Sequence, residues 1–257
     1  NDSNLNLDFK NITNSENPEI LIAGCGTGQH ALTTASKYKK SKVLALDLSF
    51  KSLSYAKRKA NELNINNIDF IQGDILDLES IGRKFDIIES VGVLHHMDNP
   101  FKGWKILTSC LNDDSLMLIG LYSEKARQHI TQIKNKINKL KLQSNHKNII
   151  KFRKDLIENN KDQWNLIKRS PDFYTVSGVR DLLFHVQEHQ FTISKIKKHL
   201  DKLGLIFLGF EDQLIKESFK KNYTNKDDLF DLDVWEEYEK FNPRIFAGMY
   251  QFWCKKN

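Results

Sequence analysis

The sequence predicts an α/β fold, a doubly wound and mostly parallel seven-stranded sheet that carries a helical insertion. Short apolar runs alternate with amphipathic helical patterns as far as residue 121, which is typical of strands and helices wound on both faces of a parallel sheet. A glycine-rich turn follows the first apolar run, at the position where such sheets bind ligands. The 257 residues divide into a polar N-terminal segment (1–17), a core (18–121), a helical insertion (122–190) and the returning part of the core (191–257).

The first three strands are short apolar runs bounded by polar or turn residues. They are expected at residues 19–23, 43–46 and 68–71. The helices between them have apolar residues at helical spacing, Ala31, Leu32 and Ala35 in the first and Leu53, Ala56, Ala60 and Leu63 in the second. Ser49 or Ser52 can cap the second helix, since a serine hydroxyl accepts a hydrogen bond from the free backbone N–H groups of a first turn.

The rest of the core continues the alternation on both sides of the insertion. Strands are expected at 85–89, 116–121, 205–210 and 246–253, and helices at 104–111 and 192–203. Gly204 is placed to end the last helix, because glycine adopts the left-handed conformation of a helix C-terminus without strain.

Two amphipathic helices are expected in the insertion. The first has an apolar stripe formed by Ala126, Ile130, Ile133, Ile137 and Leu140. Its lysines (Lys134, Lys136, Lys139 and Lys141) fit a solvated face, with phosphate binding as the alternative. The second, near 178–190, has an apolar face of Val179, Leu182, Leu183 and Val186 and a polar face of Asp181, His185, Glu188 and His189.

Composition restricts the class of protein. The three cysteines (Cys25, Cys110 and Cys254) are scattered, which argues against a disulfide framework and against a thiolate metal site. No apolar run approaches the roughly 20 residues of a membrane span, so we expect a cytoplasmic protein without membrane contact. The net charge of +6 is spread along the chain and does not by itself indicate a nucleic-acid partner.

Two acids at strand ends complete a candidate nucleotide site. The Asp47 carboxylate can accept hydrogen bonds from both hydroxyls of a ribose. The Asp74 carboxylate can accept a hydrogen bond from the amino group of an adenine, while Ile75 packs on the adenine ring. A nicotinamide dinucleotide enzyme also carries a glycine turn followed by an acid. The Gly-x-Gly-x-Gly spacing of residues 24–28, the Gly73-Asp74-Ile75 element and the strand pair after the last helix jointly resemble the pattern of a methyltransferase instead.

These motifs, with Leu94 to Pro100 (Leu-His-His-Met-Asp-Asn-Pro), resemble the class I S-adenosylmethionine-dependent methyltransferases with their Rossmann-like fold, of type 11/12. Residues 22–30 and 181–189 look like a bacterial methyltransferase module found with tetratricopeptide repeats. The resemblance implies that S-adenosyl-L-methionine, and the product S-adenosyl-L-homocysteine, bind to Ala23, Gly24, Cys25, Gly26, Gly28, Asp47, Leu48, Gly73, Asp74, Ile75, Glu89 and Ser90. Many family members have an acid at the position of Ala23 that orients the amino group of the methionine. Here that role is expected to pass to backbone carbonyls near Gly24, to Glu89 or to Gln29.

The acceptor site is expected beneath the helical lid, 122–190. Methyl transfer is an in-line displacement, so the protein mainly aligns the acceptor, and a base is needed only for an acceptor that loses a proton. The candidate catalytic residues are His185, His95 and Glu89, although His95 and His96 also fit a packing role. The candidate acceptor contacts are Tyr122, Arg127, His129, Tyr174, Arg180, His185 and Glu188.

A small-molecule acceptor is the first expectation. Base methylation is disfavoured, since Glu89-Ser90-Val91-Gly92 stands where an Asn/Asp-Pro-Pro-aromatic tetrad would be. A protein or tRNA acceptor, or a cofactor-binding regulatory module without turnover, are the alternatives. Residues 185–189 also have the His-x-x-Glu-His spacing of some zinc peptidases, but no third ligand is evident and we expect no metal.

Overall fold

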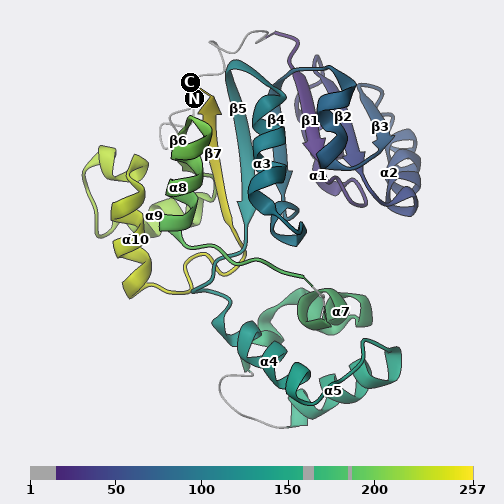
Figure 1. Ribbon diagram of the computed structural model, residues 1–257, viewed down its shortest axis with the longest axis vertical. Coiled ribbons are helices and arrows are strands. Elements are labelled where there is room, and N and C mark those ends of the chain that lie inside the picture. Colours follow the sequence, from purple (N-terminus) through teal and green to yellow (C-terminus); the bar gives the residue numbers. More distant parts are fainter. Residues whose placement is uncertain (1–15, 159–164, 185–186, 257) are drawn as a thin grey trace.

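A seven-stranded sheet in the order β3-β2-β1-β4-β5-β7-β6 forms the centre of the protein, as the computed structural model in Figure 1 shows. The structure describes residues 16–158, 165–184 and 187–256. The strands are β1 Glu19–Ala23, β2 Lys42–Asp47, β3 Ile68–Gln72, β4 Phe85–Val91, β5 Leu111–Leu121, β6 Leu205–Phe210 and β7 Tyr250–Lys256. β1 to β5 pair in parallel, and β7 is antiparallel to both of its neighbours, β5 and β6. The predicted doubly wound, mostly parallel sheet is confirmed.

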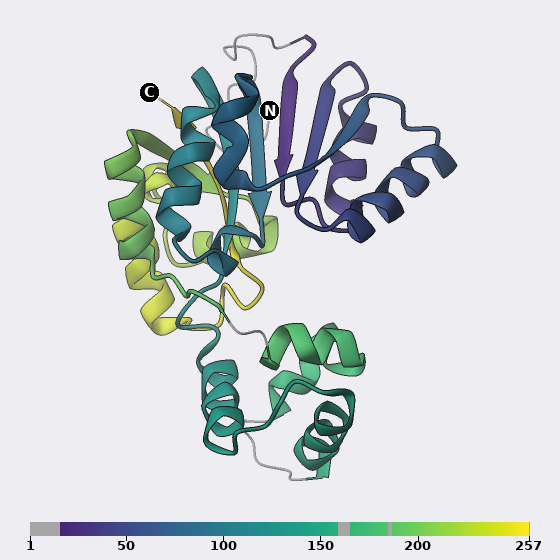
Figure 2. The same ribbon diagram turned by 45° about the vertical axis from the view of Figure 1, so that its right-hand side comes forward.

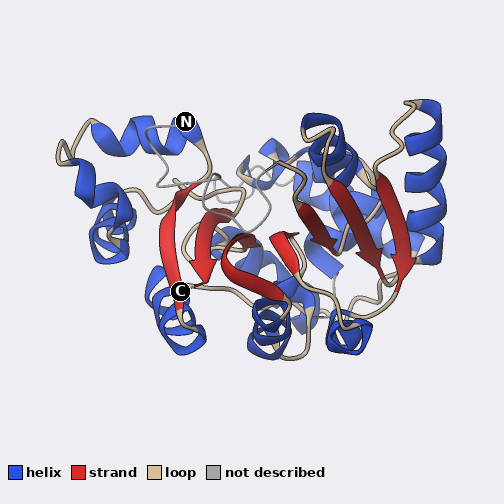
Figure 3. Ribbon diagram, turned by 90° about the horizontal axis from the view of Figure 1, so that it is seen from above, coloured by secondary structure: helices blue, strands red, loops and turns tan. Residues whose placement is uncertain are grey.

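Helices cover both faces of this sheet, as the view from above shows (Figure 3). They are α1 Gln29–Lys37, α2 Phe50–Glu62, α3 Pro100–Ser109, α8 Ile193–Leu203, α9 Gln213–Lys220 and α10 Leu232–Phe241. One apolar cluster joins the sheet to α1 and α2, and a second joins it to α3, α8 and α10. Because central strands of a parallel sheet are buried on both faces, β1 carries apolar residues at successive positions after Glu19.

The insertion forms a separate helical lobe beyond the carboxyl ends of the parallel strands (Figures 1 and 2). Its helices α4 Gln128–Lys139, α5 His146–Glu158 and α7 Val176–Phe184 pack around a core of their own, which includes Ile133, Phe152 and Leu183. The two segments that connect the lobe to the sheet run side by side, with Ser123 and Phe191 paired in a parallel bridge. The lobe is therefore held to the core through a short, double connection.

Several predicted helix faces differ in the structure. α7 ends at Phe184, and residues 187–190 are not helical, so Glu188 and His189 do not continue a polar face of that helix. Val186 and His185 lie outside the described residues. Leu63 and Leu140 end their helices as C-caps and are 61% and 54% exposed, because the apolar stripes stop one turn earlier.

The closing part of the core contains two helices that were not predicted from the sequence, α9 and α10. The last strand also begins at Tyr250 rather than at residue 246, whose phenylalanine packs in the core before the strand. Among the residues that the structure describes, none of the helices combines the length and the apolar character needed to cross a bilayer.

Candidate functional site

The glycine turn after β1 is fastened to the end of β2. The backbone N–H groups of Gly24 and Cys25 both donate to the carbonyl of Leu46, at 2.8 and 2.9 Å. Gly24 has a φ of +83°, and a Cβ there would lie 2.3 Å from a methyl carbon of Val93. A residue with a side chain is therefore excluded by backbone conformation and by space.

Gly26, at the tip of the same turn, is in a different situation. It also has a positive φ, +53°, but a Cβ at this position would meet no protein atom within 4 Å. Its N–H donates to Asp47 Oδ2 at 2.6 Å. The absence of a side chain at Gly26 thus leaves open space beside a backbone that faces the strand-end carboxylate.

Asp47 connects three segments at the carboxyl edge of the sheet. Besides Gly26, it accepts the N–H of Ser49 on Oδ1 at 2.8 Å, and its carbonyl accepts the N–H of Gly73 at 3.1 Å. Carboxylates have about four acceptor positions, so these bonds leave capacity for a ligand. The carboxylate is fixed in place by backbone donors before any ligand arrives.

Asp74 begins the 3-10 helix η1, Ile75–Ile81, and its Oδ1 accepts the N–H of Leu76 at 2.9 Å. Ile75, expected to pack on the adenine ring, is buried in the apolar cluster of the core, whereas Leu48, which follows β2, is 67% exposed. Gln72 bonds from its side-chain amide to the carbonyl of Leu48 at 3.1 Å, which joins the ends of β2 and β3. The strand ends therefore present one exposed apolar side chain and two carboxylates.

A cavity of about 420 Å³ lies against the glycine turn and the start of α1. It is lined by Ile22, Gly24, Cys25, Gly26, Thr27, Gln29, His30, Thr33 and Val91. Ala23 does not line it, since this side chain packs in the apolar cluster on the other face of the sheet. Ile22 is the strand-end residue that faces the cavity, and Ile22 pairs in register with Glu89 of β4.

Glu89 is a buried carboxylate next to this cavity, 4% exposed. Its Oε2 lies 2.7 Å from His30 Nε2 and accepts the hydroxyl of Thr34 at 2.9 Å, both from α1. The hydrogen bond to Glu89 raises the pKa of His30, and burial opposes this shift. Among the described residues no group donates to Oε1, so one carboxylate oxygen remains available to a cation.

Cys25 and Ser90, the other predicted cofactor contacts near the turn, are both buried. Burial, together with the charge of Asp47, raises the pKa of the Cys25 thiol to about 12. Cys25 therefore stays protonated and is a poor nucleophile at neutral pH. Ser90 is fully buried, and its hydroxyl has no hydrogen-bond partner within the described part of the chain.

A second group of candidates meets where the lobe joins the core. His95 is fully buried in η2, Leu94–His96, and stacks on the ring of Tyr122 with centroids 3.8 Å apart. The guanidinium carbon of Arg127 lies 3.6 Å from the centroid of the Tyr122 ring, within the range of a cation–π contact. The structure thus stacks an imidazole, a phenol ring and a guanidinium in one column.

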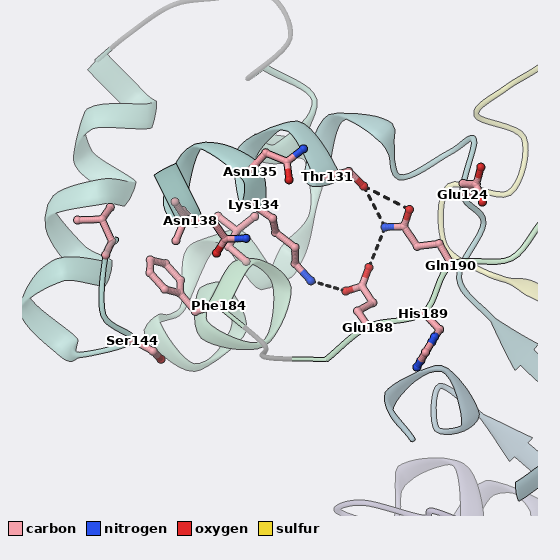
Figure 4. Close-up of a pocket in the computed structure, with 13 residues that line it drawn as sticks. Glu124, Thr131, Lys134, Asn135, Asn138, Ser144, Phe184, Glu188, His189 and Gln190 are labelled. Carbon is pink, nitrogen blue, oxygen red and sulfur yellow. Dashed lines mark hydrogen bonds and ion pairs between the residues drawn. The ribbon is translucent and has the colours of Figure 1, made fainter. Parts of the chain in front are cut away.

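Glu188 ends this column and is surrounded by donors. Its two carboxylate oxygens accept hydrogen bonds from Arg127 Nε and Nη2, one on each oxygen and both at 3.1 Å. It also accepts hydrogen bonds from Lys134 Nζ at 2.7 Å and from the side-chain amide of Gln190 at 3.1 Å. Burial alone would raise the pKa of Glu188, but Arg127 and the other donors outweigh it and lower the pKa to about 2. Lys134, expected on a solvated face, is only 16% exposed and belongs to this network (Figure 4).

The remaining acceptor candidates lie apart from this network. Tyr174 and Arg180 are exposed on the lobe. His129 is half-buried, and burial, with the nearby charges of Arg244 and Arg127, lowers its pKa. His185 lies outside the described residues, so its predicted role as a base stays a prediction. His189 donates its backbone N–H to the carbonyl of His95 at 2.7 Å, which ties the lobe to the loop after β4.

The side chains that bond to Glu89 were not predicted from the sequence. Thr34 is 5% exposed between Ala31 and Ala35, on the face of α1 that packs against the sheet. A hydroxyl on an otherwise apolar buried face indicates a buried acceptor opposite it. That signal, with His30 one turn earlier on the helix, could have identified the pair.

The methyltransferase domain family matches residues 14–170, well over half of the chain. The protein belongs to the class I S-adenosylmethionine-dependent methyltransferases. The match includes the glycine turn, both strand-end aspartates and the first two helices of the lobe.

This methyltransferase is also similar to individual proteins and solved structures. An uncharacterised protein of Synechococcus is 27% identical over 89% of this chain and 58% of its own length. A probable (S)-tetrahydroprotoberberine N-methyltransferase 2 of Papaver bracteatum is 33% identical over 43% of the chain and 30% of its own length. PKMT2 from Rickettsia typhi, also solved in complex with AdoHcy, has the same fold, with a TM-score of 0.67, 21% identity and coverage of 93% of this chain and 48% of its own. The chain thus spans about a third to three fifths of the length of these relatives.

Proposed function

We propose that this methyltransferase transfers the methyl group of S-adenosylmethionine to a small-molecule acceptor. The observation that carries the proposal is the turn at Gly26, which has open space beside it and an N–H bonded to the Asp47 carboxylate. This arrangement suits a nucleoside whose ribose hydroxyls are accepted by Asp47 and whose adenine packs against Leu48. Asp74 would accept the adenine amino group, and the remaining proposed contacts come from the residues of the turn and the end of β4.

The methionine end of the cofactor would lie in the cavity beside His30 and Glu89. Its ammonium group is a cation, and Glu89 Oε1 is a carboxylate oxygen without a donor among the described residues. This assignment gives Glu89 the role of cofactor anchor rather than of base. It also supplies the acid that β1 lacks.

A lone pair of the acceptor forms the bond to the methyl carbon, and the electrons of the bond from that carbon to sulfur stay on sulfur, so the thioether leaves neutral. A neutral acceptor takes over the positive charge and loses it with a proton where it carries one, and an anionic acceptor becomes neutral. Little covalent work falls on the protein, so alignment and exclusion of water dominate the catalysis. The lobe beyond the strand ends is the part of the chain suited to cover the acceptor. The N-methyltransferase name of a partial relative supports a small acceptor, as does a cavity of about 850 Å³ in the lobe, a size typical of small-molecule sites.

Calorimetry with S-adenosylhomocysteine and a labelled-methyl transfer assay test this function. The full chain is incubated with S-adenosylmethionine labelled in the methyl group and with a metabolite extract, total protein or tRNA. We expect binding of the product and label in the small-molecule fraction. Label confined to protein or tRNA would contradict the small acceptor, binding without transfer would indicate a regulatory module, and no binding would contradict the function itself.

A further inference from the structure

The cavity of the helical lobe has its own chemistry, apart from the cofactor cavity. It is lined by Glu124, Thr131, Lys134, Asn135, Asn138 and Glu188, with further residues from α4, α7 and the segment 187–190. In Figure 4 Lys134 contacts Glu188 on the wall of this cavity, while His189 lies on the side of the core. The cavity therefore extends from α4 to the segment that bonds to the loop after β4.

Lys134 and Glu188 line the cavity, and Arg127 lies behind Glu188 as its second cationic partner. Arg127 and Lys134 carry two positive charges, and Glu188 between them carries one negative charge. The other acid of the lining, Glu124, is paired with Lys195 at 2.8 Å. Among the described hydrogen bonds and ion pairs of this network, the two cations therefore share one carboxylate.

Of the two cations, Lys134 is the less fully occupied. Arg127 donates two hydrogen bonds to Glu188 and covers the Tyr122 ring, so its guanidinium is already occupied. Among the described residues Lys134 donates one hydrogen bond, to Glu188, although an ammonium has three donors. With its side chain only 16% exposed, it also has limited access to water.

Two exposed amide side chains of the same helix also line the cavity. Asn135 and Asn138 project from α4 beside Lys134, and neither side chain has a hydrogen-bond partner in the described segments (Figure 4). An amide can donate two hydrogen bonds to an anion that a lysine attracts. A cation with unused donors and two unpartnered amides in a cavity of about 850 Å³ fits a small organic anion.

We propose that the lobe cavity binds the carboxylate or phosphate group of the methyl acceptor, with Lys134 as the charged contact and Asn135 and Asn138 as neutral donors. The proposal rests on the proposed function, because it makes this group the anchor of the acceptor. Anchored there, the rest of the acceptor extends past His189 toward the loop after β4. Glu188 stays ionised and holds Lys134 in place without serving as a base.

Nuclear magnetic resonance of the ¹⁵N-labelled full chain, saturated with S-adenosylhomocysteine, tests this site. The protein is titrated with succinate or with inorganic phosphate, at constant ionic strength maintained with potassium chloride. We expect saturable shifts of the side-chain amides of Asn135 and Asn138. The anion that binds more tightly identifies the acceptor group as a carboxylate or a phosphate.

Two lysine variants of the same helix make the test specific. Lys134→Met should weaken anion binding at least about tenfold, as expected for loss of a hydrogen bond to a charged group. Lys139→Met removes an equal charge from the exposed end of α4 and should change affinity by less than about twofold. Shifts that do not saturate, or equal losses in both variants, would overturn the proposal.

S-adenosylhomocysteine binding is measured on the same samples. It should be unchanged in both variants, because neither lysine lies near the glycine turn. Failure of the wild-type chain to bind S-adenosylhomocysteine would count against the proposed function, whereas normal binding of the product without anion binding would count against the lobe site alone.

Discussion

Arg127 and Glu188, 61 residues apart in the chain, form a two-point ion pair in which each carboxylate oxygen accepts one guanidinium nitrogen at 3.1 Å. The pair joins the segment that enters the lobe to the segment that leaves it. Because the Arg127 and Glu188 side chains are only 6% and 4% exposed, water cannot replace either partner. Loss of one partner would leave a buried charge uncompensated.

Glu188→Gln should therefore lower the free energy of unfolding by about 3 kcal/mol. This value is at the lower end of the range for a broken buried ion pair, because Lys134 keeps some contact with water. Chemical denaturation followed by circular dichroism measures the change. Glu124→Gln is the matched control, because the side chains of Glu124 and of its partner Lys195 are both about half-exposed. This substitution should lower the free energy of unfolding by less than about 1 kcal/mol. Equal effects of the two substitutions would contradict a buried, structural role for Glu188.

The same carboxylate predicts a loss of stability in acid. The pKa of Glu188 is lowered from 4.5 to about 2, so its contribution to stability is present above the unfolded value and is lost as the pH falls toward 2. The free energy of unfolding should decrease between about pH 4.5 and pH 2 more steeply in the wild type than in Glu188→Gln. Parallel pH profiles would contradict this assignment.

Asp47→Ala should weaken binding of S-adenosylhomocysteine by at least about 1.5–3 kcal/mol, the usual loss for hydrogen bonds to a charged group. The ribose would lose its acceptor, and the turn at Gly26 would lose the carboxylate that holds its N–H. Calorimetry measures the affinity, and circular dichroism checks the fold. Asp69→Ala, on the exposed side of β3, is the control, and an equal loss there would remove the special role of Asp47.

Gly26→Val should abolish binding of S-adenosylhomocysteine, because its side chain would fill the open space beside the turn. The positive φ adds a folding cost of roughly 1–2 kcal/mol. Gly82→Val is a close control, since Gly82 has a φ of +65° and a Cβ there also meets no atom within 4 Å. Gly82 lies after η1, away from the turn, so this variant should lose similar stability and keep its affinity. Retained binding in Gly26→Val would show that this turn is not the cofactor loop.

The main features of the fold could be predicted from local sequence because strands buried on both faces need continuous apolar runs. β1 has the predicted limits for this reason. β6 also has the predicted limits, although it is an edge strand and its Ile206 is 45% exposed. α9 and α10 were missed although Asp212 and Asp231 cap them, since each helix is short and its apolar face is completed only by packing of Phe219 on Trp235. Short helices depend on tertiary contacts more than on their own periodicity.

In the candidate site too, some residue positions could be predicted from local sequence and others could not. Asp47 and Asp74 were predictable, because the ends of parallel strands meet at one edge whatever the rest of the chain does. The ion pair between Arg127 and Glu188 was not, since it depends on how the two lobe connections align. The helical pattern near 178–190 also suggested that Glu188 projects from a helix, whereas α7 ends at Phe184 and Glu188 turns to the cations of α4 and its N-terminus.

The ion pair of His30 with Glu89 should stabilise the fold more at low pH than at high pH, which is the opposite of the effect expected for Glu188. Its pKa is raised above 6.5 by the hydrogen bond to Glu89, so the pair stabilises the fold fully below about pH 6.5 and less as the pH rises through the folded value. The melting temperature of the wild type should exceed that of His30→Gln by more at pH 6 than at pH 8.5, as measured by calorimetry. A difference independent of pH would mean that His30 acts through packing alone.

Glu89→Gln should separate the two ends of the cofactor. The substitution keeps the shape of the side chain and an oxygen for the Thr34 hydroxyl, but it removes the charge that Oε1 offers to an ammonium group. The affinity for S-adenosylhomocysteine should therefore fall at least about tenfold. Methylthioadenosine contains the same adenine, ribose and sulfur without the amino-acid end, so its affinity should change by less than about twofold. Calorimetry with both ligands on one preparation provides the comparison. Equal weakening of both would mean that Glu89 only supports the fold of α1 against β4, and unchanged affinity for S-adenosylhomocysteine would mean that the ammonium group is held elsewhere, with Gln29 as the next residue to replace.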